Sequence, residues 1–224
     1  MERVCPVCDS SNVTEIKPNL SECGNCFHMF QSDLLVRVSY DAEYAHKYDA
    51  YPHQKISEIR LALLQKVRNV NSVLDVGYGN GSFIKSAILL GYDGYGSDLH
   101  GEDFGVIDIE LSKAKPEAFE VITFFDSLEH FSDLRLVTHL EPKAVIVSIP
   151  ERYDNVMRSD PTEWKHYRPG EHLHYFSHTS LSVFMKNWGG YKLTHGSYEE
   201  DSVRGKILLE GVPSNNIYTA VYEQ

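Results

Sequence analysis

The sequence predicts an α/β fold with a largely parallel sheet, preceded by a small metal-binding module. Val73, Leu74 and Val76 form a short apolar run, which is typical of a strand buried on both faces. Three glycines, at positions 77, 79 and 81, follow this run and precede a helical pattern, so we expect a strand, a tight loop and a helix. Four cysteines near the N-terminus form two Cys-x2-Cys pairs, and 224 residues suffice for one α/β domain with a small appendage.

Composition and charge limit the classes of partner. The formal net charge of -11 argues against a large basic surface for a nucleic-acid backbone, so nucleic acid is an unexpected partner. No apolar run approaches the roughly 18 to 20 residues that span a bilayer, and residues 1–9 lack a signal-peptide core. We therefore expect a cytoplasmic protein without a membrane span. The sequence indicates no oligomeric state.

The cysteine pairs predict a zinc ribbon over residues 1–38. Cys5 and Cys8 are separated from Cys23 and Cys26 by 14 intervening residues, and two such pairs complete the tetrahedral S4 shell that zinc prefers. Iron fits the same ligands less well, and disulfides are unusual in a cytoplasmic chain. The acidic balance of residues 1–38 favours a docking or substrate-covering module over a nucleic-acid finger.

A helical linker or lid is expected over residues 39–70. Tyr40, Tyr44 and Tyr48 share one helical face, for which packing is favoured over an aromatic wall above a substrate. Apolar residues then recur at helical spacing and predict an amphipathic helix over 56–70 that packs on the sheet. They are Ile56, Ile59, Leu63, Val67 and Val70.

Residues 71–224 are expected to form the main α/β domain. Apolar periodicity and the glycine stop signals after residues 90 and 188 predict two helices, over 82–90 and 180–188. The strands expected after the first are 94–98, 106–109, 121–125 and 144–149, followed by antiparallel strands over 191–197, 206–210 and 217–222.

The spacing of the glycine loop indicates its ligand. Gly77-x-Gly79-x-Gly81 differs from the Gly-x-Gly-x-x-Gly of dinucleotide sites, which disfavours NAD. Asp75 would repel a pyrophosphate and attract an α-ammonium group. Asp98 lies about 20 residues beyond the loop, where an acid holds a ribose diol. These residues together suit an adenosine that bears an amino acid.

The same residues resemble motif I of the class I S-adenosylmethionine-dependent methyltransferases, with Tyr78 and Asn80 at its variable positions. The stretches 119–130, 164–167 and 171–177 also resemble this family, and with the cysteine pairs they resemble its zinc-ribbon members from deoxysugar and surface-polysaccharide pathways. The motif order agrees from Cys5 to Trp188. The sugar C-methyltransferases of this kind are longer and carry a further C-terminal domain, which leaves the acceptor open.

The resemblance implies a Rossmann-like, seven-stranded methyltransferase sheet with a small N-terminal zinc ribbon, and S-adenosylmethionine and zinc as cofactors. In this fold, Asp108 lies where the adenine amino group often binds, and Phe125 and Asp126 lie at the carboxyl end of a strand, where ligands bind. The expected cofactor-binding residues are Asp75, Gly77, Tyr78, Gly79, Asp98, Leu99, Asp108, Phe125 and Asp126.

The resemblance also implies a catalytic base. The sugar methyltransferases use a Glu-His pair in a comparable stretch, which falls on Glu171 and His172, although Pro169 and Gly170 replace the tyrosine expected just upstream. His130 is the rival base, and a capping or packing role for Glu171 and His172 remains the alternative.

The histidines from 166 to 178 predict no second metal site, because no thiolate or helical His-x3-His pairing supports one. The expected function is methyl transfer to a small-molecule acceptor, such as a sugar or sugar nucleotide. The alternatives are an RNA methyltransferase that reads RNA through its ribbon, and a regulatory protein that binds the cofactor without chemistry. Whether O, N or C is methylated stays open.

Overall fold

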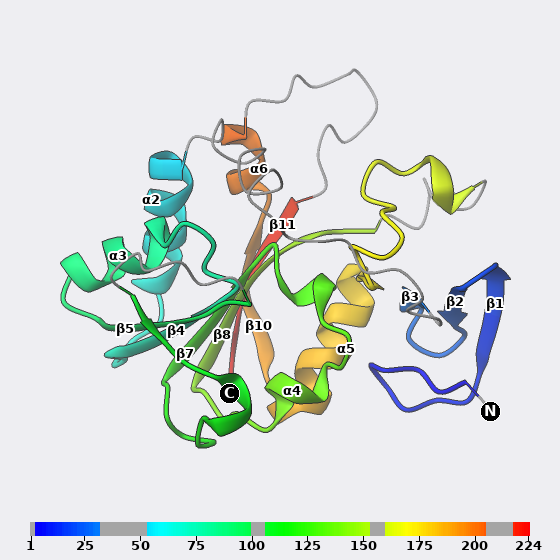
Figure 1. Ribbon diagram of the computed structural model, residues 1–224, viewed down its shortest axis with the longest axis horizontal. Coiled ribbons are helices and arrows are strands. Elements are labelled where there is room, and N and C mark those ends of the chain that lie inside the picture. The colour runs from blue at the N-terminus through cyan, green and yellow to red at the C-terminus, as the bar shows by residue number, and fades with distance from the viewer. Residues whose placement is uncertain (1–2, 32–52, 100–105, 153–159, 205–216) are drawn as a thin grey trace.

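A computed structural model describes residues 3–31, 53–99, 106–152, 160–204 and 217–224. These residues form a seven-stranded sheet in the order β10-β11-β8-β7-β4-β5-β6 (Figure 1). The strands are β4 (Ser72–Val76), β5 (Asp93–Ser97), β6 (Ile107–Asp108), β7 (Val121–Phe125), β8 (Ala144–Pro150), β10 (Lys192–Ser197) and β11 (Ile217–Glu223). The five strands from β6 to β8 pair in parallel, whereas β11 is antiparallel to β8 and to β10. The α/β prediction is confirmed.

Helices cover both faces of this sheet. Figure 1 shows α2 (His53–Leu64) and α3 (Ser82–Leu89) on one side and α5 (His178–Gly189) on the other. Successive residues of the central strands face opposite layers, as the pleat of a strand requires. Val121 and Phe125 of β7 join the core under α2 and α3, whereas Ile122 and Phe124 join the core under α5.

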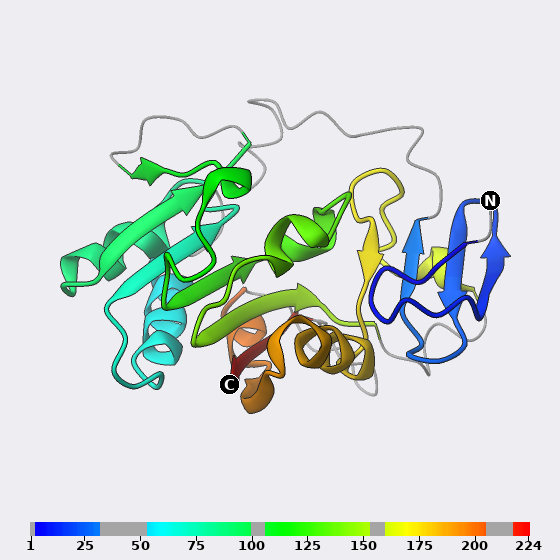
Figure 2. The same cartoon turned by 90° about the horizontal axis from the view of Figure 1, so that it is seen from below.

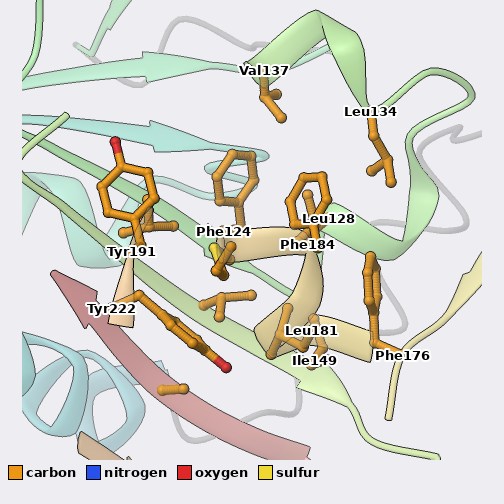
Figure 3. Packing of buried hydrophobic residues seen from close by; sticks show 14 of the residues in the cluster. Phe124, Leu128, Leu134, Val137, Ile149, Phe176, Leu181, Phe184, Tyr191 and Tyr222 are labelled. Atoms are coloured by element: carbon orange, nitrogen blue, oxygen red, sulfur yellow. The ribbon is translucent and has the colours of Figure 1, made fainter. Parts of the chain in front are cut away.

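The core under α5 is rich in aromatic side chains. Figure 3 shows Phe124 and Leu128 packed among Phe184 and Leu181 of α5, with Tyr222 of β11 nearby. All five side chains are buried, and this apolar burial is the main favourable contribution to folding. The main domain also contains the short helices α4 (Arg135–Thr138) and α6 (Glu199–Val203) and the 3-10 turns η1 (Leu111–Lys113), η2 (Leu128–His130) and η3 (Pro161–Glu163).

Capping decides where the predicted helices begin and end. Helix α5 starts at residue 178 rather than 180, because the Ser177 hydroxyl accepts a hydrogen bond from the Ser180 amide and the Ser180 hydroxyl accepts one from the Ser177 amide. Gly190 ends α5 with a φ of 73°, as the glycine signal predicts.

The prediction of a helix over 56–70 is wrong at its end. Helix α2 stops at Leu64, after which the Val67 amide bonds the carbonyl three residues back and Asn69 adopts a φ of 57°. Val67 and Val70 still pack on the core from this turn, so the apolar repeat continues past the helix. Residues 39–52 of the linker expected over 39–70, and the expected strand over 206–210, lie outside the described residues.

The N-terminal module shares a sheet with the main domain. Its strands β1 (Val13–Lys17), β2 (Leu20–Cys23) and β3 (Met29–Gln31) pair in sequence, and β3 also pairs with β9 (His174–Tyr175), which lies within the stretch 171–177 of the main domain. Figure 2 shows β9 between the N-terminal strands and the large sheet. The sequence does not predict this junction. Among the helices of the described ranges, none is long and apolar enough to cross a membrane.

Candidate active site

The glycine loop joins β4 to α3 at the carboxyl edge of the large sheet. Gly77, Gly79 and Gly81 have φ values of 77°, 54° and 72°, which other residues adopt only with strain. A Cβ on Gly77 would lie 2.5 Å from the Cβ of Ser127, whereas one on Gly79 would meet nothing within 4 Å. Gly77 therefore permits the close approach of the segment after β7, and Gly79 leaves its backbone accessible to a ligand.

Three predicted cofactor residues are joined by hydrogen bonds at this edge. The Gly79 amide donates to Oδ2 of Asp98 over 3.0 Å, and the Asp98 amide donates to Oδ1 of Asp108 over 3.2 Å. Tyr78 is buried beneath the loop, where a Cβ on Gly96 would lie 2.3 Å from its Cδ1. Leu99 is 88% exposed and offers an apolar surface next to Asp98.

Asp75 lies below the loop, inside the sheet. Its side chain is buried, and its Oδ1 accepts a 2.6 Å hydrogen bond from the Thr123 hydroxyl on the neighbouring strand. Burial raises the pKa of Asp75 to about 6, against the hydrogen bond from Thr123 and the charge of Arg60, which lower it. The carboxylate thus contributes negative charge beneath the loop.

Phe125 ends β7 and Asp126 follows it, and both residues contact arginines that the sequence does not single out. The guanidinium of Arg60 lies 4.1 Å from the centre of the Phe125 ring. Asp126 has a φ of 56°, and its Oδ2 lies 2.5 Å from Nη2 of Arg204 and 3.4 Å from Nη2 of Arg60. Glu200 of α6 is buried and binds both arginines; burial disfavours its charge, yet the two guanidinium groups lower its pKa to about 2.

This edge fits an adenosine that bears an amino acid. The accessible amide of Gly79 and the amino end of α3 suit negative or polar ligand groups, and Asp98 lies where a carboxylate can accept hydrogen bonds from a ribose diol. The negative charge of Asp75 suits an ammonium group. The structure brings the predicted cofactor residues to one edge, although Asp75 and Tyr78 lie beneath its surface.

A cluster of two Glu-His dipeptides lies just beyond β7, and we call Glu129, His130, Glu171 and His172 the Glu-His cluster. The Leu173 amide donates to the Glu129 carbonyl over 2.8 Å, which holds the segment before β9, with Glu171 and His172, beside η2. The two imidazole rings meet edge to face, with centroids 4.8 Å apart. The structure therefore brings together both bases that the sequence offers as rivals.

Hydrogen bonds fix the tautomers of both histidines. Nδ1 of His130 lies 2.9 Å from the Glu171 carbonyl oxygen, and Nδ1 of His172 lies 2.9 Å from the His166 carbonyl oxygen. A carbonyl oxygen only accepts, so each Nδ1 carries the proton and each neutral ring keeps its lone pair on Nε2. Burial lowers the pKa of His130, and it lowers that of His172 to well below the usual value.

Glu129 is the carboxylate of the cluster that the sequence does not identify as functional. It is 2% exposed, and burial raises its pKa well above the usual value, with the charge of Asp126 adding to the effect. Its Oε1 lies 3.9 Å from Nε2 of His130. Glu171 is partly exposed and pairs with Arg168 over 2.9 Å. The Leu-Glu-His motif after a buried strand is the only sequence signal we find for Glu129.

The four cysteines converge as a metal site requires. The Sγ atoms of Cys5 and Cys26 are 3.6 Å apart, those of Cys8 and Cys23 are 3.5 Å apart, and all four lie within 4.8 Å of one another. These separations are too long for a disulfide bond of about 2.05 Å. A tetrahedral zinc site with Zn–S bonds of about 2.3 Å has S–S edges of about 3.8 Å, so the four thiols fit zinc.

Comparisons with known proteins identify the fold of the main domain. A family described as a methyltransferase domain matches residues 44–195, and a search of curated proteins gives no match. The fold is similar to that of 1,6-didemethyltoxoflavin-N1-methyltransferase from Burkholderia thailandensis, solved with 1,6-didemethyltoxoflavin and S-adenosylhomocysteine. That structure is 12% identical with a TM-score of 0.56, and the match covers 95% of this chain and 99% of that one.

Two further structures share the fold. A SAM-dependent methyltransferase from Archaeoglobus fulgidus is 14% identical with a TM-score of 0.53, and the match covers 82% of this chain and 100% of that one. A possible histamine N-methyltransferase from Thermotoga maritima is 16% identical with a TM-score of 0.54, covering 81% of this chain and 94% of that one.

Proposed function

Because this chain belongs to the methyltransferase-domain family and is an S-adenosylmethionine-dependent methyltransferase, we propose that it methylates a small-molecule acceptor beside the Glu-His cluster. The observation that carries the proposal is the convergence of two Glu-His dipeptides just beyond β7, next to the edge that fits the cofactor. Ligands of open α/β sheets bind at the carboxyl ends of the strands, which is where this cluster lies.

The cofactor would be held by the loop and by the acids of the neighbouring strands. Gly77 and Gly79 let it approach the backbone, Asp98 would accept hydrogen bonds from its ribose, and Asp75 would supply negative charge near its amino-acid end. The bound cofactor supplies an electrophilic methyl group. The chain then has to place the acceptor within attack distance and assist the loss of its proton.

The Glu-His cluster suits this second task. The Nε2 lone pairs of His130 and His172 belong to a partly buried and a buried ring, and a polar group acts strongly on a bound acceptor where water is largely excluded. A small acceptor is favoured by the net charge of -11 and by neighbours whose names specify toxoflavin-type and possible histamine substrates. Within this class, the resemblance to sugar and polysaccharide methyltransferases favours a sugar or sugar nucleotide.

We further propose that Cys5, Cys8, Cys23 and Cys26 hold one zinc ion and that the ribbon positions the acceptor site. The Gln31 amide of the ribbon donates to the Leu173 carbonyl over 2.9 Å, directly beside His172. Arg152 of the main domain is buried, and its Nη1 donates to Glu22 of the ribbon over 2.7 Å. These contacts support a bracing role for the ribbon rather than RNA reading.

A turnover assay tests the proposed function. The protein is incubated with S-adenosylmethionine and a panel of small acceptors that includes sugar nucleotides, and S-adenosylhomocysteine is measured by mass spectrometry. His172→Ala should lower turnover by about 10² to 10⁴ without changing cofactor affinity, because a positioned group that removes or polarises a proton contributes about that much. The exposed His139→Ala is the matched control and should keep parental turnover. Methylation of RNA but not of any small acceptor would contradict the proposal.

A further inference from the structure

The Glu-His cluster has the donor set of a metal site. The inference drawn from it rests on the proposed function, because the cluster is the proposed acceptor site. One ligand atom from each of Glu129, His130 and His172 lies within 4.8 Å of the other two. We propose that these three residues bind a divalent first-row cation, distinct from the zinc of the four cysteines. Two imidazoles and one carboxylate form a set that leaves further coordination positions open to an acceptor.

The hydrogen bonds of both histidines match those of metal ligands. A ligating histidine generally donates its other ring N–H to a carbonyl or carboxylate, which fixes the tautomer and the ring orientation. His130 donates from Nδ1 to the Glu171 carbonyl, and His172 donates from Nδ1 to the His166 carbonyl, each over 2.9 Å. Both Nε2 atoms are therefore in the state that coordinates a cation.

Glu129 supplies the third ligand and the strongest reason for a cation. Its side chain is 2% exposed, and within the described residues its Oε2 has no hydrogen-bond partner. Buried carboxylates are normally hydrogen-bonded, paired with a cation or coordinated to a metal. The other oxygen of the same carboxylate, Oε1, lies 3.9 Å from Nε2 of His130, which is too long for a hydrogen bond. A cation bound by this carboxylate and by the two histidines would compensate the buried, unpartnered Oε2.

The geometry requires only a small contraction. Adjacent ligands around an ion with bonds of about 2.1 Å lie about 3 Å apart, so each of the three side chains would move inward by less than about 1 Å. The side chain of His130 is 17% exposed, which gives the site one side that faces solvent. An acceptor that approaches from this side could complete the coordination.

The inference narrows the acceptor to a compound with a hydroxyl group. A divalent cation acts as a Lewis acid toward a hydroxyl oxygen and lowers the pKa of that hydroxyl. The hydroxyl proton would pass to water, an O–CH3 bond would form as the S–CH3 bond of the sulfonium breaks, and a neutral thioether would leave. The Glu-His cluster would then activate the acceptor by holding the cation rather than by direct proton abstraction.

Manganese binding tests the inference on the full, zinc-loaded chain. Mn²⁺ is the weakest binder of the first-row series and prefers oxygen ligands to thiolates, so it does not displace zinc from four thiolates. Titration followed by the electron paramagnetic resonance of unbound Mn²⁺ should give one bound ion per chain. Glu129→Gln and His172→Asn should each weaken binding at least tenfold, while the control His139→Ala should bind as the parent does.

A second measurement uses the parent protein only, so its result does not depend on whether the variants fold. Pulsed electron paramagnetic resonance of Mn²⁺ bound to the parent should detect ¹⁴N coupling from two imidazoles. Absence of a bound ion in the parent, or a bound ion without imidazole coupling, would overturn the inference. If the parent methylates a small acceptor but binds no Mn²⁺, the metal site is refuted and the proposed function is kept. A bound ion with imidazole coupling, but no methylated small acceptor, would support the metal site and refute the proposed function.

Discussion

Asp98 is held in place through both its backbone and its side chain. Its backbone amide donates to Asp108 and its Oδ2 accepts from Gly79, so the residue is fixed by both neighbours before any ligand arrives. A carboxylate held in place loses little conformational entropy when it binds a ribose, which favours affinity. Its position beside the glycine loop was predictable, because the spacing from the loop to the end of the second strand is set by local chain geometry.

We predict that Asp98→Ala weakens S-adenosylmethionine binding by about 10- to 100-fold. The change removes hydrogen bonds to a charged group, which are worth about 1.5 to 3 kcal/mol. Isothermal titration calorimetry measures the dissociation constant directly. Asp93→Ala, at the opposite end of β5, is the matched control and should bind the cofactor as the parent does. Equal affinity of Asp98→Ala and the parent would refute the ribose assignment.

Other residues of the site could not be predicted from the sequence, because their contacts join segments that are far apart along the chain. Arg204 and Arg60 are 144 positions apart, yet both pair with Glu200. Glu129 gains its significance only when the segment after residue 170 folds back beside η2. Local patterns predicted the glycine loop and the cysteine cluster, since the residues that make up each of them lie within a few positions of one another or on neighbouring elements.

At the scale of elements, the junction between β3 and β9 determines how the N-terminal module acts on the main domain. Strand β3 pairs Met29 with Tyr175 and Phe30 with His174 of β9. Beside this pairing, Nε2 of buried His28 lies 3.0 Å from Nδ1 of His174. The Cys-x2-Cys pairs predicted a small module but not this pairing, because a two-residue strand leaves no periodic pattern. Helix α6 was missed for a related reason, since five residues are too few for a helical repeat.

We predict that Cys8→Ser and Cys23→Ser reduce the zinc content from one ion per chain to below about a tenth, because a tetrahedral site loses one of its four thiolates. Without the metal the ribbon should lose order, since metal binding supplies much of the folding energy of such small modules. Elemental analysis measures the zinc. Hydrogen exchange should then speed up at the amide of Tyr175 on β9, which the ribbon covers.

The exposed Ser11→Ala, within the same module, controls for a general effect of substitution and should retain zinc and parental exchange. Zinc-free parent protein with unchanged exchange at β9 would contradict the bracing role. Because β9 follows the Glu-His cluster directly, loss of the ribbon should also lower turnover while cofactor affinity persists.

At the scale of the whole molecule, the large sheet places a titratable carboxyl at its centre. Asp75 lies on β4, the strand between β5 and β7, and is 3% exposed. The sequence predicted the strand and the acid but not its depth, since burial on both faces depends on which helices cover the sheet. Desolvation there disfavours the charged form, so Asp75 couples the stability of the whole domain to pH.

We predict that this coupling destabilises the protein as pH rises through about 6. The folded-state pKa of Asp75 is about 6, whereas that of an unfolded aspartate is about 3.9. The folded state therefore binds the proton more tightly, and the stabilisation is complete below about pH 4 and is lost as the pH rises through the folded-state value. A difference of about two pKa units corresponds to about 3 kcal/mol.

Urea unfolding of the parent and Asp75→Asn from pH 4 to 8 measures this effect, because the other titrating groups cancel in the difference. The uncharged amide keeps an oxygen that can accept from Thr123, so Asp75→Asn should gain up to about 3 kcal/mol relative to the parent between pH 4 and 7. Glu163→Gln, at an exposed turn, is the control and should follow the parent at every pH. Parallel curves for the parent and Asp75→Asn would mean that Asp75 has the same pKa in the folded and unfolded states, and that its charge is stabilised in the sheet by a partner beyond Thr123.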